Sequence, residues 1–398
     1  MKLILLSDSV FSDRDYDRFG INTLLERKVE VELWCFQNIR HEIIRNNTNL
    51  FEGENEKINR YIFSDYMDLE RKKIDLTGVF IIDKRSGFYG KYNTCWFQLH
   101  GGIIVKLNSS LLPASDVTYL NSLKQKLLAL GNKKSLFFMV AAIKNKLRHI
   151  IAKQCNPDIV VCTGLDSNLF NSKRFIGSHA FDYDIYLSLE SQKSTTVKAE
   201  VDYMVFLDNG MVSHPDYKLL SIEPYCTKDK YYRSMNNLFD MLEHKFSIPV
   251  VIAIHPRSVN ISEIKEMYGG RKVFKGRSAE LVRDANTVIA HDSTSINFSI
   301  LWNKPLLIIS TDEILKNYIS YISIKNILSL LKTNSINADD FDPDMDFEIL
   351  ANKPIKQYQI YKEKLIKTKG TPDKNSCDIF IDELLLFYPA QSGRSISR

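Results

Sequence analysis

The chain has 398 residues, of which 44% are hydrophobic and 25% are charged, and its formal net charge is +5. This length exceeds what one ordinary core can fill and predicts two domains, while the composition is typical of a soluble globular protein. The net charge is too small to indicate a nucleic-acid partner, and no apolar run approaches the roughly 18 residues needed to span a bilayer.

The first residues and the cysteines indicate a cytoplasmic protein. The opening MKLILLSDSV is too short and too quickly acidic for a signal peptide, and it predicts a first buried strand instead. The six cysteines are scattered, form no CxxC pair and lie mostly in apolar segments. Such spacing favours reduced, buried thiols over disulfides or a zinc site.

The first half of the chain alternates strand-like and helix-like segments. A helix is expected over residues 19–27, and residues 95–105 are expected to form a strand that His100-Gly101-Gly102 interrupts. Further strands are expected at residues 3–6, 29–36, 79–82 and 159–162. Alternation of this kind predicts a parallel sheet with covering helices.

Residues 121–154 form a basic amphipathic segment. Between positions 121 and 153 there are eight Lys or Arg and no Asp or Glu, with Leu and Ile at helical spacing between them. One interpretation is a surface attracted to anionic lipid headgroups on the inner face of the cytoplasmic membrane. The other is a pair of core-facing helices with a solvated basic face, and the absence of acids favours the first. The segment lacks the interleaved aromatic residues that stack on nucleic-acid bases.

A polar stretch at residues 191–200 separates two aromatic-rich segments, 180–190 and 203–207, which are both expected to be strands. We place the domain boundary in this stretch, which gives domains over residues 1–195 and 196–388 and a flexible tail over 389–398. The second domain is expected to be a compact doubly wound unit. Its expected helices are residues 231–246, 278–284, 294–301, 358–369 and 379–388, and its expected strands are 250–254, 272–274, 287–290 and 305–309.

The strand expected at residues 250–254 ends in His255-Pro256-Arg257. In an open α/β sheet, ligands bind outside the carboxyl ends of the strands. There, the imidazole of His255 could reach a phosphate or a ribose, Pro256 fixes the backbone as it leaves the sheet, and Arg257 adds a charge suited to phosphate or carboxylate. The alternative is a His-Pro turn that merely ends a strand.

The next expected strand is followed by His291-Asp292 and then by three hydroxyl residues, Ser293, Thr294 and Ser295, which open a helix. Several hydroxyls and backbone N–H groups at a helix start can donate to one phosphate. The alternative is an ordinary N-cap, for which one hydroxyl is enough. Glu280 lies in the first turn of the helix expected at 278–284, where its alternative role is to interact with the helix dipole.

Three motifs of this second domain resemble those of bacterial sialyltransferases, which are GT-B glycosyltransferases. His255-Pro256 is similar to their His-Pro motif, Thr294-Ser295 to their Ser-Ser/Thr motif, and Asp208-Asn209-Gly210 to their acidic-acidic-Gly motif with Asn in the second place. The layout is also similar to that of Kdo transferases. The resemblance covers mainly residues 200–310 and implies an α/β GT-B fold, with two Rossmann-like domains that face a central cleft.

The resemblance implies a glycosyltransferase that moves an acidic sugar (sialic acid, another nonulosonate or Kdo) from a CMP-activated donor to a bacterial surface glycan or glycolipid. The acceptor would belong to lipopolysaccharide, lipooligosaccharide or capsule. In such enzymes these motifs hold the cytidine monophosphate, so His255, Pro256, Arg257, Glu280 and the hydroxyls of residues 293–295 are expected to bind the donor. No DxD triplet follows an expected strand, and neither a metal nor another cofactor is expected.

Two other functions remain open on the sequence. One keeps the fold but uses a UDP-sugar or CDP-glycerol to build a polymer, or epimerises a nucleotide-sugar without an acceptor. The other is a non-catalytic scaffold that binds a nucleotide without turnover. A homodimer is left open as well.

The transfer needs a base that takes a proton from the acceptor hydroxyl. The resemblance offers Asp208, although in that family the catalytic acid lies in the first domain and Asp208 is expected in the second, where it could contact the donor instead. Asp166 and Asp8 are rival carboxylates at the ends of first-domain strands, and His100 could protonate or pair with the leaving phosphate. Each of these first-domain residues also has a simple explanation as part of a turn.

Overall fold

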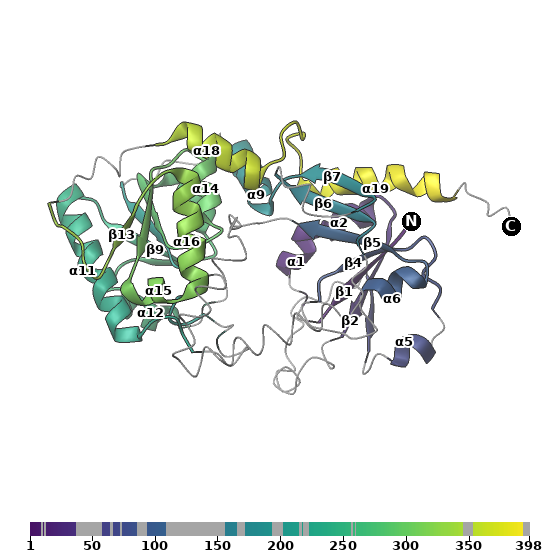
Figure 1. The fold of residues 1–398 in the computed structure, drawn as a ribbon, viewed down its shortest axis with the longest axis horizontal. Coiled ribbons are helices and arrows are strands. Elements are labelled where there is room, and N and C mark those ends of the chain that lie inside the picture. Colours follow the sequence, from purple (N-terminus) through teal and green to yellow (C-terminus); the bar gives the residue numbers. More distant parts are fainter. Residues whose placement is uncertain are drawn as a thin grey trace, which may run out of the picture.

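The structure is a computed structural model, and it describes residues 1–8, 11, 13–36, 58–63, 67–71, 74–85, 94–108, 156–164, 172–192, 202–214, 217, 223–255, 258, 260–344 and 353–392. Figure 1 shows two β-sheets, each with its own covering helices, side by side along the long axis of the molecule. The basic segment 121–154 lies outside the described residues. Among the described helices, none is both long enough and apolar enough to cross a membrane.

The first sheet consists of β1 (Lys2–Ser7), β2 (Glu30–Cys35), β3 (Asn59–Ile62), β4 (Phe80–Asp83), β5 (Ile103–Asn108), β6 (Ile159–Thr163) and β7 (Arg174–Ser178). Its order is β3-β2-β1-β4-β5-β6-β7, and all neighbours are parallel. Side chains of β1 alternate between two cores, with Leu3 and Leu5 in one and Ile4 and Leu6 in the other. A strand buried on both faces explains the uninterrupted apolar run of the sequence.

Helices cover both faces of this sheet. Helices α1 (Asp13–Arg18), α2 (Ile21–Glu26) and α19 (Ser376–Ser392) belong to the core that contains Leu3, while α5 (Met67–Arg71) and α6 (Thr94–Leu99) belong to the core that contains Ile4. The chain therefore returns to the first sheet with its last described helix (Figure 1).

The prediction of a strand over residues 95–105 is wrong for the first half of this range, which forms α6. The helix ends because Gly101 adopts a positive φ of 91° and the N–H of Gly102 donates to the carbonyl oxygen of Phe97 at 2.9 Å. A left-handed glycine of this kind is a common helix C-terminus.

The expected reduced state of the cysteines also needs correction, since Cys95 is in a disulfide. Four other cysteines, Cys35, Cys162, Cys226 and Cys377, are buried free thiols.

The second sheet consists of β8 (Met204–Leu207), β9 (Val250–Ile254), β10 (Val273–Lys275), β11 (Thr287–Ala290), β12 (Leu306–Ser310) and β13 (Ser335–Asn337). Its order is β10-β9-β8-β11-β12-β13, again with parallel neighbours. This is the strand order of a dinucleotide-binding Rossmann fold. The expected doubly wound unit is therefore confirmed.

The helices of the second sheet are α11 (Lys228–Phe246), α12 (Ile261–Met267), α13 (Ser278–Asp284), α14 (Ile296–Leu301), α15 (Asp312–Lys316) and α16 (Tyr318–Leu331). Three of them, α12, α15 and α16, were not expected from the sequence. Helix α16 brings Ser323 to Asp292 at the carboxyl end of β11, which matters for the site below.

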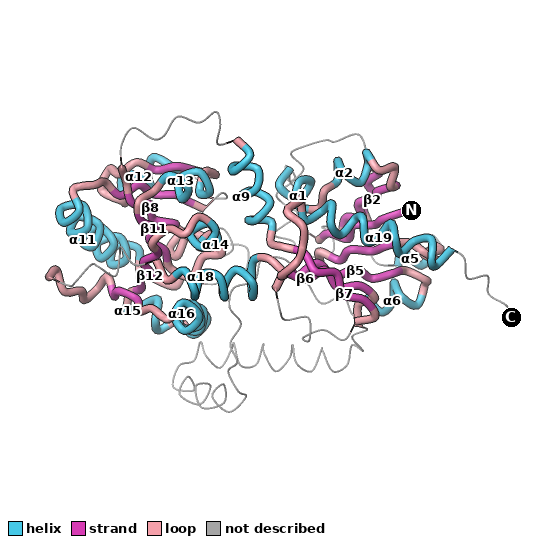
Figure 2. Tube along the Cα trace, turned by 90° about the horizontal axis from the view of Figure 1, so that it is seen from above, coloured by secondary structure: helices cyan, strands magenta, loops and turns pink. Residues whose placement is uncertain are grey.

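The segment expected as a strand over residues 180–190 is instead α9 (Phe181–Ser191). The correction has a tertiary cause, because α9 packs against α13 and α14 of the second domain (Figure 2). Asn297 donates a hydrogen bond to Asp182 at 2.8 Å, and Trp302 donates one to Glu190 at 2.7 Å. Both partners belong to α14, Trp302 as its C-terminal cap. Asp182 and Glu190 are eight residues apart, and a helix keeps them close enough to contact this one short helix, whereas a strand would place them more than twice as far apart.

The connection back to the first domain runs through α18 (Ile355–Tyr361) and a π-helical turn at Lys362–Ile366. We expected residues 196–388 to form the second domain, but α9 packs with the second sheet and α19 with the first. The chain thus crosses between the domains twice. Helix α19 also extends through Ser392, into the segment that we expected to be a flexible tail.

Candidate functional site

The strand order of the second sheet reverses between β8 and β11, and at such a point the following loops diverge and leave room for a ligand. The carboxyl ends of the neighbouring strands carry Asp208-Asn209-Gly210, His255, the segment from His291 to Ser295, and Ser310. The structure therefore brings together the three sequence motifs at one edge of one sheet. Pro256 and Arg257 lie outside the described residues, so their expected roles stay predictions.

Asp208 is enclosed at this edge. Asp208 is 8% exposed, and its carboxylate accepts a hydrogen bond of 2.7 Å from the N–H of Gly210, which has a φ of 74°. The buried hydroxyl of Tyr268 lies beside it. Burial raises the pKa of Asp208. The carboxylate thus holds the turn after β8 and faces the interior of the domain.

Asn209 and Asp292 link the two loops of the switch point. The Asn209 amide Nδ2 donates to Oδ1 of Asp292 at 3.1 Å. Burial raises the pKa of Asp292 to about 6, while its own backbone N–H, the nearby Ser323 hydroxyl and the hydrogen bond from Asn209 act in the opposite direction. Asp292 is half-buried, so part of its surface remains open to solvent. The sequence alone had suggested no role for this residue.

His291 is completely buried just before Asp292. Its Nδ1 lies 2.8 Å from the carbonyl oxygen of Ile309, and its Nε2 lies 3.0 Å from the hydroxyl of Tyr231. A carbonyl only accepts, so Nδ1 carries the proton and Nε2 accepts from the tyrosine. Burial lowers the pKa of His291 to about 4, which keeps the imidazole neutral. The ring fixes the start of the loop that contains Asp292.

One of the three hydroxyls acts as a side-chain cap. Ser293 accepts a hydrogen bond of 3.2 Å from the N–H of Ser295, and its carbonyl oxygen accepts one of 3.2 Å from the N–H of Ile296. Ser295, which directly precedes α14, makes no side-chain capping hydrogen bond, and Thr294 is exposed. The capping alternative therefore accounts for Ser293 and gives Thr294 and Ser295 no capping role. Glu280 is half-buried in the first turn of α13, which also begins at the carboxyl edge of the sheet.

A row of imidazole and phenol rings borders this edge, and sequence reasoning missed most of it. The ring of His214 lies 4.7 Å from that of His255 and 6.1 Å from that of Tyr217, and Tyr217 lies 5.4 Å from Tyr225. The hydroxyl of Tyr217 donates to the carbonyl oxygen of Met211 at 2.9 Å. The signal available in the sequence was the group of His and Tyr residues that follows β8.

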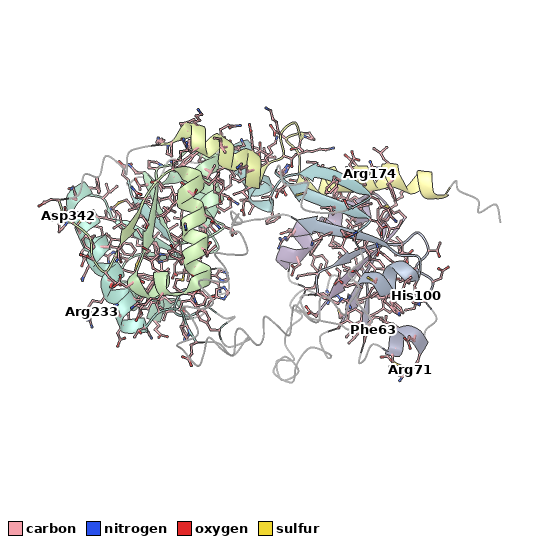
Figure 3. The ribbon with its side chains drawn as sticks, viewed as in Figure 1. Phe63, Arg71, His100, Arg174, Arg233 and Asp342 are labelled. Atoms are coloured by element: carbon pink, nitrogen blue, oxygen red, sulfur yellow. The ribbon has the colours of Figure 1, made fainter. Side chains whose placement is uncertain are left out.

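His100 lies elsewhere. It follows α6 and precedes β5, so it occupies the amino edge of the first sheet, and it stacks on Trp96 with ring centroids 3.9 Å apart. Figure 3 shows it on the side of the first domain that faces away from the second. Its expected role at a leaving phosphate is therefore not supported by its position. Asp166 lies outside the described residues, and Asp8 is buried at 1% exposure after β1.

A pocket of about 580 Å³ lies at the opposite, amino edge of the second sheet. Its lining includes Arg271, which donates to Glu243 at 2.7 Å and to Asp240 at 2.5 Å. The charge of this arginine is thus already neutralised by protein carboxylates, and we assign the pocket no ligand.

Within the described part of the chain, no group of three His, Cys, Asp or Glu is arranged to hold a metal ion. That the protein works without a metal remains a prediction.

No protein-family model matches the sequence, and no curated protein is significantly similar to it. Solved structures, by contrast, match over almost the whole chain. A variant of the wall teichoic acid polymerase TagF gives a TM-score of 0.52 at 10% identity, with 99% of this chain and 90% of that chain covered. A TagF variant soaked with CDPG gives 0.51 at 9% identity and the same coverage.

MurG from Acinetobacter baumannii gives a TM-score of 0.49 at 9% identity, with 97% of this chain and 99% of that chain covered. At such identities the likeness concerns architecture alone. The two doubly wound parallel sheets, joined by a chain that crosses between them twice, agree with the likeness to the TagF structures. The chain has the GT-B fold expected from its sequence motifs.

Proposed function

We propose that this protein is a glycosyltransferase that binds a nucleotide-activated donor at the carboxyl edge of the second sheet. The observation that carries the proposal is the convergence of His255, Asn209 and the hydroxyls of residues 293–295 at the switch point between β8 and β11. Hydroxyl and imidazole donors at a strand-end crevice suit the phosphate and ribose of a nucleotide. Glu280 at the same edge suits ribose hydroxyls.

For the donor we propose a CMP-activated acidic sugar, which the His-Pro and Ser-Thr-Ser motifs support through their resemblance to sialyltransferases and Kdo transferases. The acceptor would then be a hydroxyl of a bacterial surface glycan or glycolipid. We further propose that the basic residues of segment 121–154 hold the enzyme peripherally at the inner face of the cytoplasmic membrane, close to a lipid-linked acceptor.

A second candidate is a polymer transferase that uses CDP-glycerol or a UDP-sugar. It is favoured by one specific observation, the likeness to TagF structures at TM-scores of 0.51 and 0.52. Both candidates place the nucleotide at the same edge. They differ in the activated group and in the number of phosphates that the site must bind.

The test is calorimetric binding of CMP, CDP, UMP, UDP and GDP to the wild type, His255→Ala and His100→Ala. The last variant is a matched control, because His100 is an exposed histidine at the far edge of the other sheet. We expect selective CMP binding that His255→Ala weakens at least tenfold and His100→Ala leaves unchanged. Preference for CDP or UDP would favour the second candidate, and no nucleotide binding at all would refute both.

A further inference from the structure

The sequence left open which carboxylate removes the proton from the acceptor, and the structure separates the carboxylates that it describes; Asp166 lies outside the described residues. The Asp208 carboxylate faces the interior and already accepts a hydrogen bond from the N–H of Gly210, and Asp8 is buried after β1. Asp292 lies at the switch point of the nucleotide-binding sheet, directly before Ser293, and keeps an open face. Of these three carboxylates, Asp292 is the one that is both adjacent to the expected donor site and accessible.

The environment of Asp292 suits a carboxylate that exchanges a proton. Asn209 holds it from the β8 loop at 3.1 Å, and Ser323 approaches it from α16. The titratable groups that face it from other segments are the phenols of Tyr217 and Tyr225. Both are neutral near pH 7, because the pKa of each is raised above its usual value of 10. No described cation contributes to the pKa of Asp292.

Buried polar atoms without a protein partner lie around the same carboxylate. The Oδ1 atom of Asn209 has no hydrogen-bond donor among the described residues, while the Nδ2 atom of the same amide is fixed by Asp292. Ser310 is fully buried and its hydroxyl likewise lacks a partner there. Ser310 is the last residue of β12, the strand next to β11, and Asp292 lies in the loop that follows β11. Asn209 thus holds the carboxylate from the buried side, and the half-buried Asp292 is the acceptor that an arriving hydroxyl would meet.

We propose that Asp292 is the catalytic base of the transfer and that Asn209 is its positioning residue. The inference rests on the proposed glycosyltransferase function. The acceptor hydroxyl gives its proton to the Asp292 carboxylate as its oxygen forms the new bond to the anomeric carbon. The bond from that carbon to the donor phosphate oxygen breaks, and the nucleotide leaves with the electron pair of that bond. The protonated Asp292 then returns its proton to solvent.

The test compares wild type, Asp292→Asn and Asp342→Asn in transfer assays. Asp342 is an exposed loop aspartate at the far end of the second domain (Figure 3), so it controls for the change of charge. We expect kcat to fall about 10²–10⁴-fold in Asp292→Asn, the range typical of general-base catalysis, and to stay within twofold of wild type in Asp342→Asn. Calorimetric nucleotide binding should be unchanged in Asp292→Asn, and its thermal midpoint should be no lower than that of wild type because the variant removes a buried charge; both results show that the variant is folded.

A pH profile separates catalysis from structure. The wild-type kcat should fall on the acid side, with a limb near pH 6 that matches the raised pKa of Asp292. Asn209→Ala removes a donor to the carboxylate and should move this limb to higher pH. Transfer within threefold of wild type in Asp292→Asn, or an acid limb that Asn209→Ala does not move, would overturn the inference. If wild type transfers from no nucleotide-sugar, the proposed function itself fails.

Discussion

Gly164, at the carboxyl end of β6, tests how the two domains are joined. It adopts a φ of 83°, and a Cβ added there would lie 1.6 Å from the carbonyl oxygen of Lys364 in the π-helical turn. Its N–H donates to the hydroxyl of Thr368 at 2.9 Å, and that hydroxyl donates to the carbonyl oxygen of Cys162 at 3.2 Å. The returning chain therefore touches the first sheet backbone to backbone at this glycine.

Replacing Gly164 with Ala should destabilise the protein by about 3 kcal/mol. A left-handed φ costs an L-residue roughly 1–2 kcal/mol, and the loss of a neutral hydrogen bond costs about 1 kcal/mol. The contact with Lys364 involves backbone atoms, so no side-chain rotation can relieve it. The end of β6 and the turn would have to separate, and the bond to Thr368 would break with that movement.

Gly370→Ala is the matched control. Gly370 has nearly the same φ, 84°, but an added Cβ would meet no described atom within 4 Å. Urea unfolding followed by circular dichroism should show only the conformational cost in this variant, roughly 1–2 kcal/mol. Nucleotide affinity should be unchanged in both variants, since the second-sheet edge is untouched. Equal destabilisation of the two variants would refute the argument from close approach.

Two further predictions concern His291 and the basic segment. The folded pKa of His291, about 4, lies below its usual 6.5, so its stabilisation is complete above pH 6.5 and is lost as the pH falls toward 4. Asp292 changes the stability in the opposite direction in this window, so the test compares wild type with His291→Gln. Between pH 7 and about pH 4.5, the free energy of unfolding in urea should fall by about 2–3 kcal/mol more in wild type than in the variant. Equal losses in the two proteins would contradict this pH dependence. Replacing the eight Lys and Arg of residues 121–153 with Gln should abolish co-sedimentation with anionic vesicles at low salt, and undiminished binding would defeat membrane attachment.

Much of the second domain could be predicted because its signals are local. The strand Thr287–Ala290 and the helix Ser278–Asp284 have the expected bounds. Each is a short apolar run or an amphipathic turn enclosed by polar residues, so hydrophobic periodicity alone defines it. The location of the motifs at strand ends followed directly from those runs.

The features that the sequence did not predict depend on contacts distant in the chain. Residues 180–190 have the aromatic content of a strand, but contacts with α13 and α14 make them helical. Nothing local to Cys377 or Phe380 indicates that they pack under the first sheet rather than the second. The same holds for Asp292, whose neighbours Asn209 and Ser323 come from segments 83 and 31 residues away.

The carboxyl edges of the two sheets differ in what covers their polar groups, and this difference supports the placement of the proposed donor site at the second sheet. In the first sheet, Asp83 at the end of β4 accepts two hydrogen bonds from the guanidinium of Arg85, at 2.9 and 2.8 Å. This guanidinium is buried near Phe36 and Phe97. At β6, the edge is occupied by the returning chain at Thr368. These polar groups are satisfied within the protein. The Ser178 hydroxyl at the end of β7 is buried without a described partner, but the returning chain covers this strand end, where the N–H of Thr368 donates to the carbonyl oxygen of Ser178 at 3.0 Å. At the second-sheet edge, Asn209 Oδ1 and the Ser310 hydroxyl are buried without a partner among the described residues. Unsatisfied buried polar atoms are costly, so they are expected where a ligand or bound water completes them.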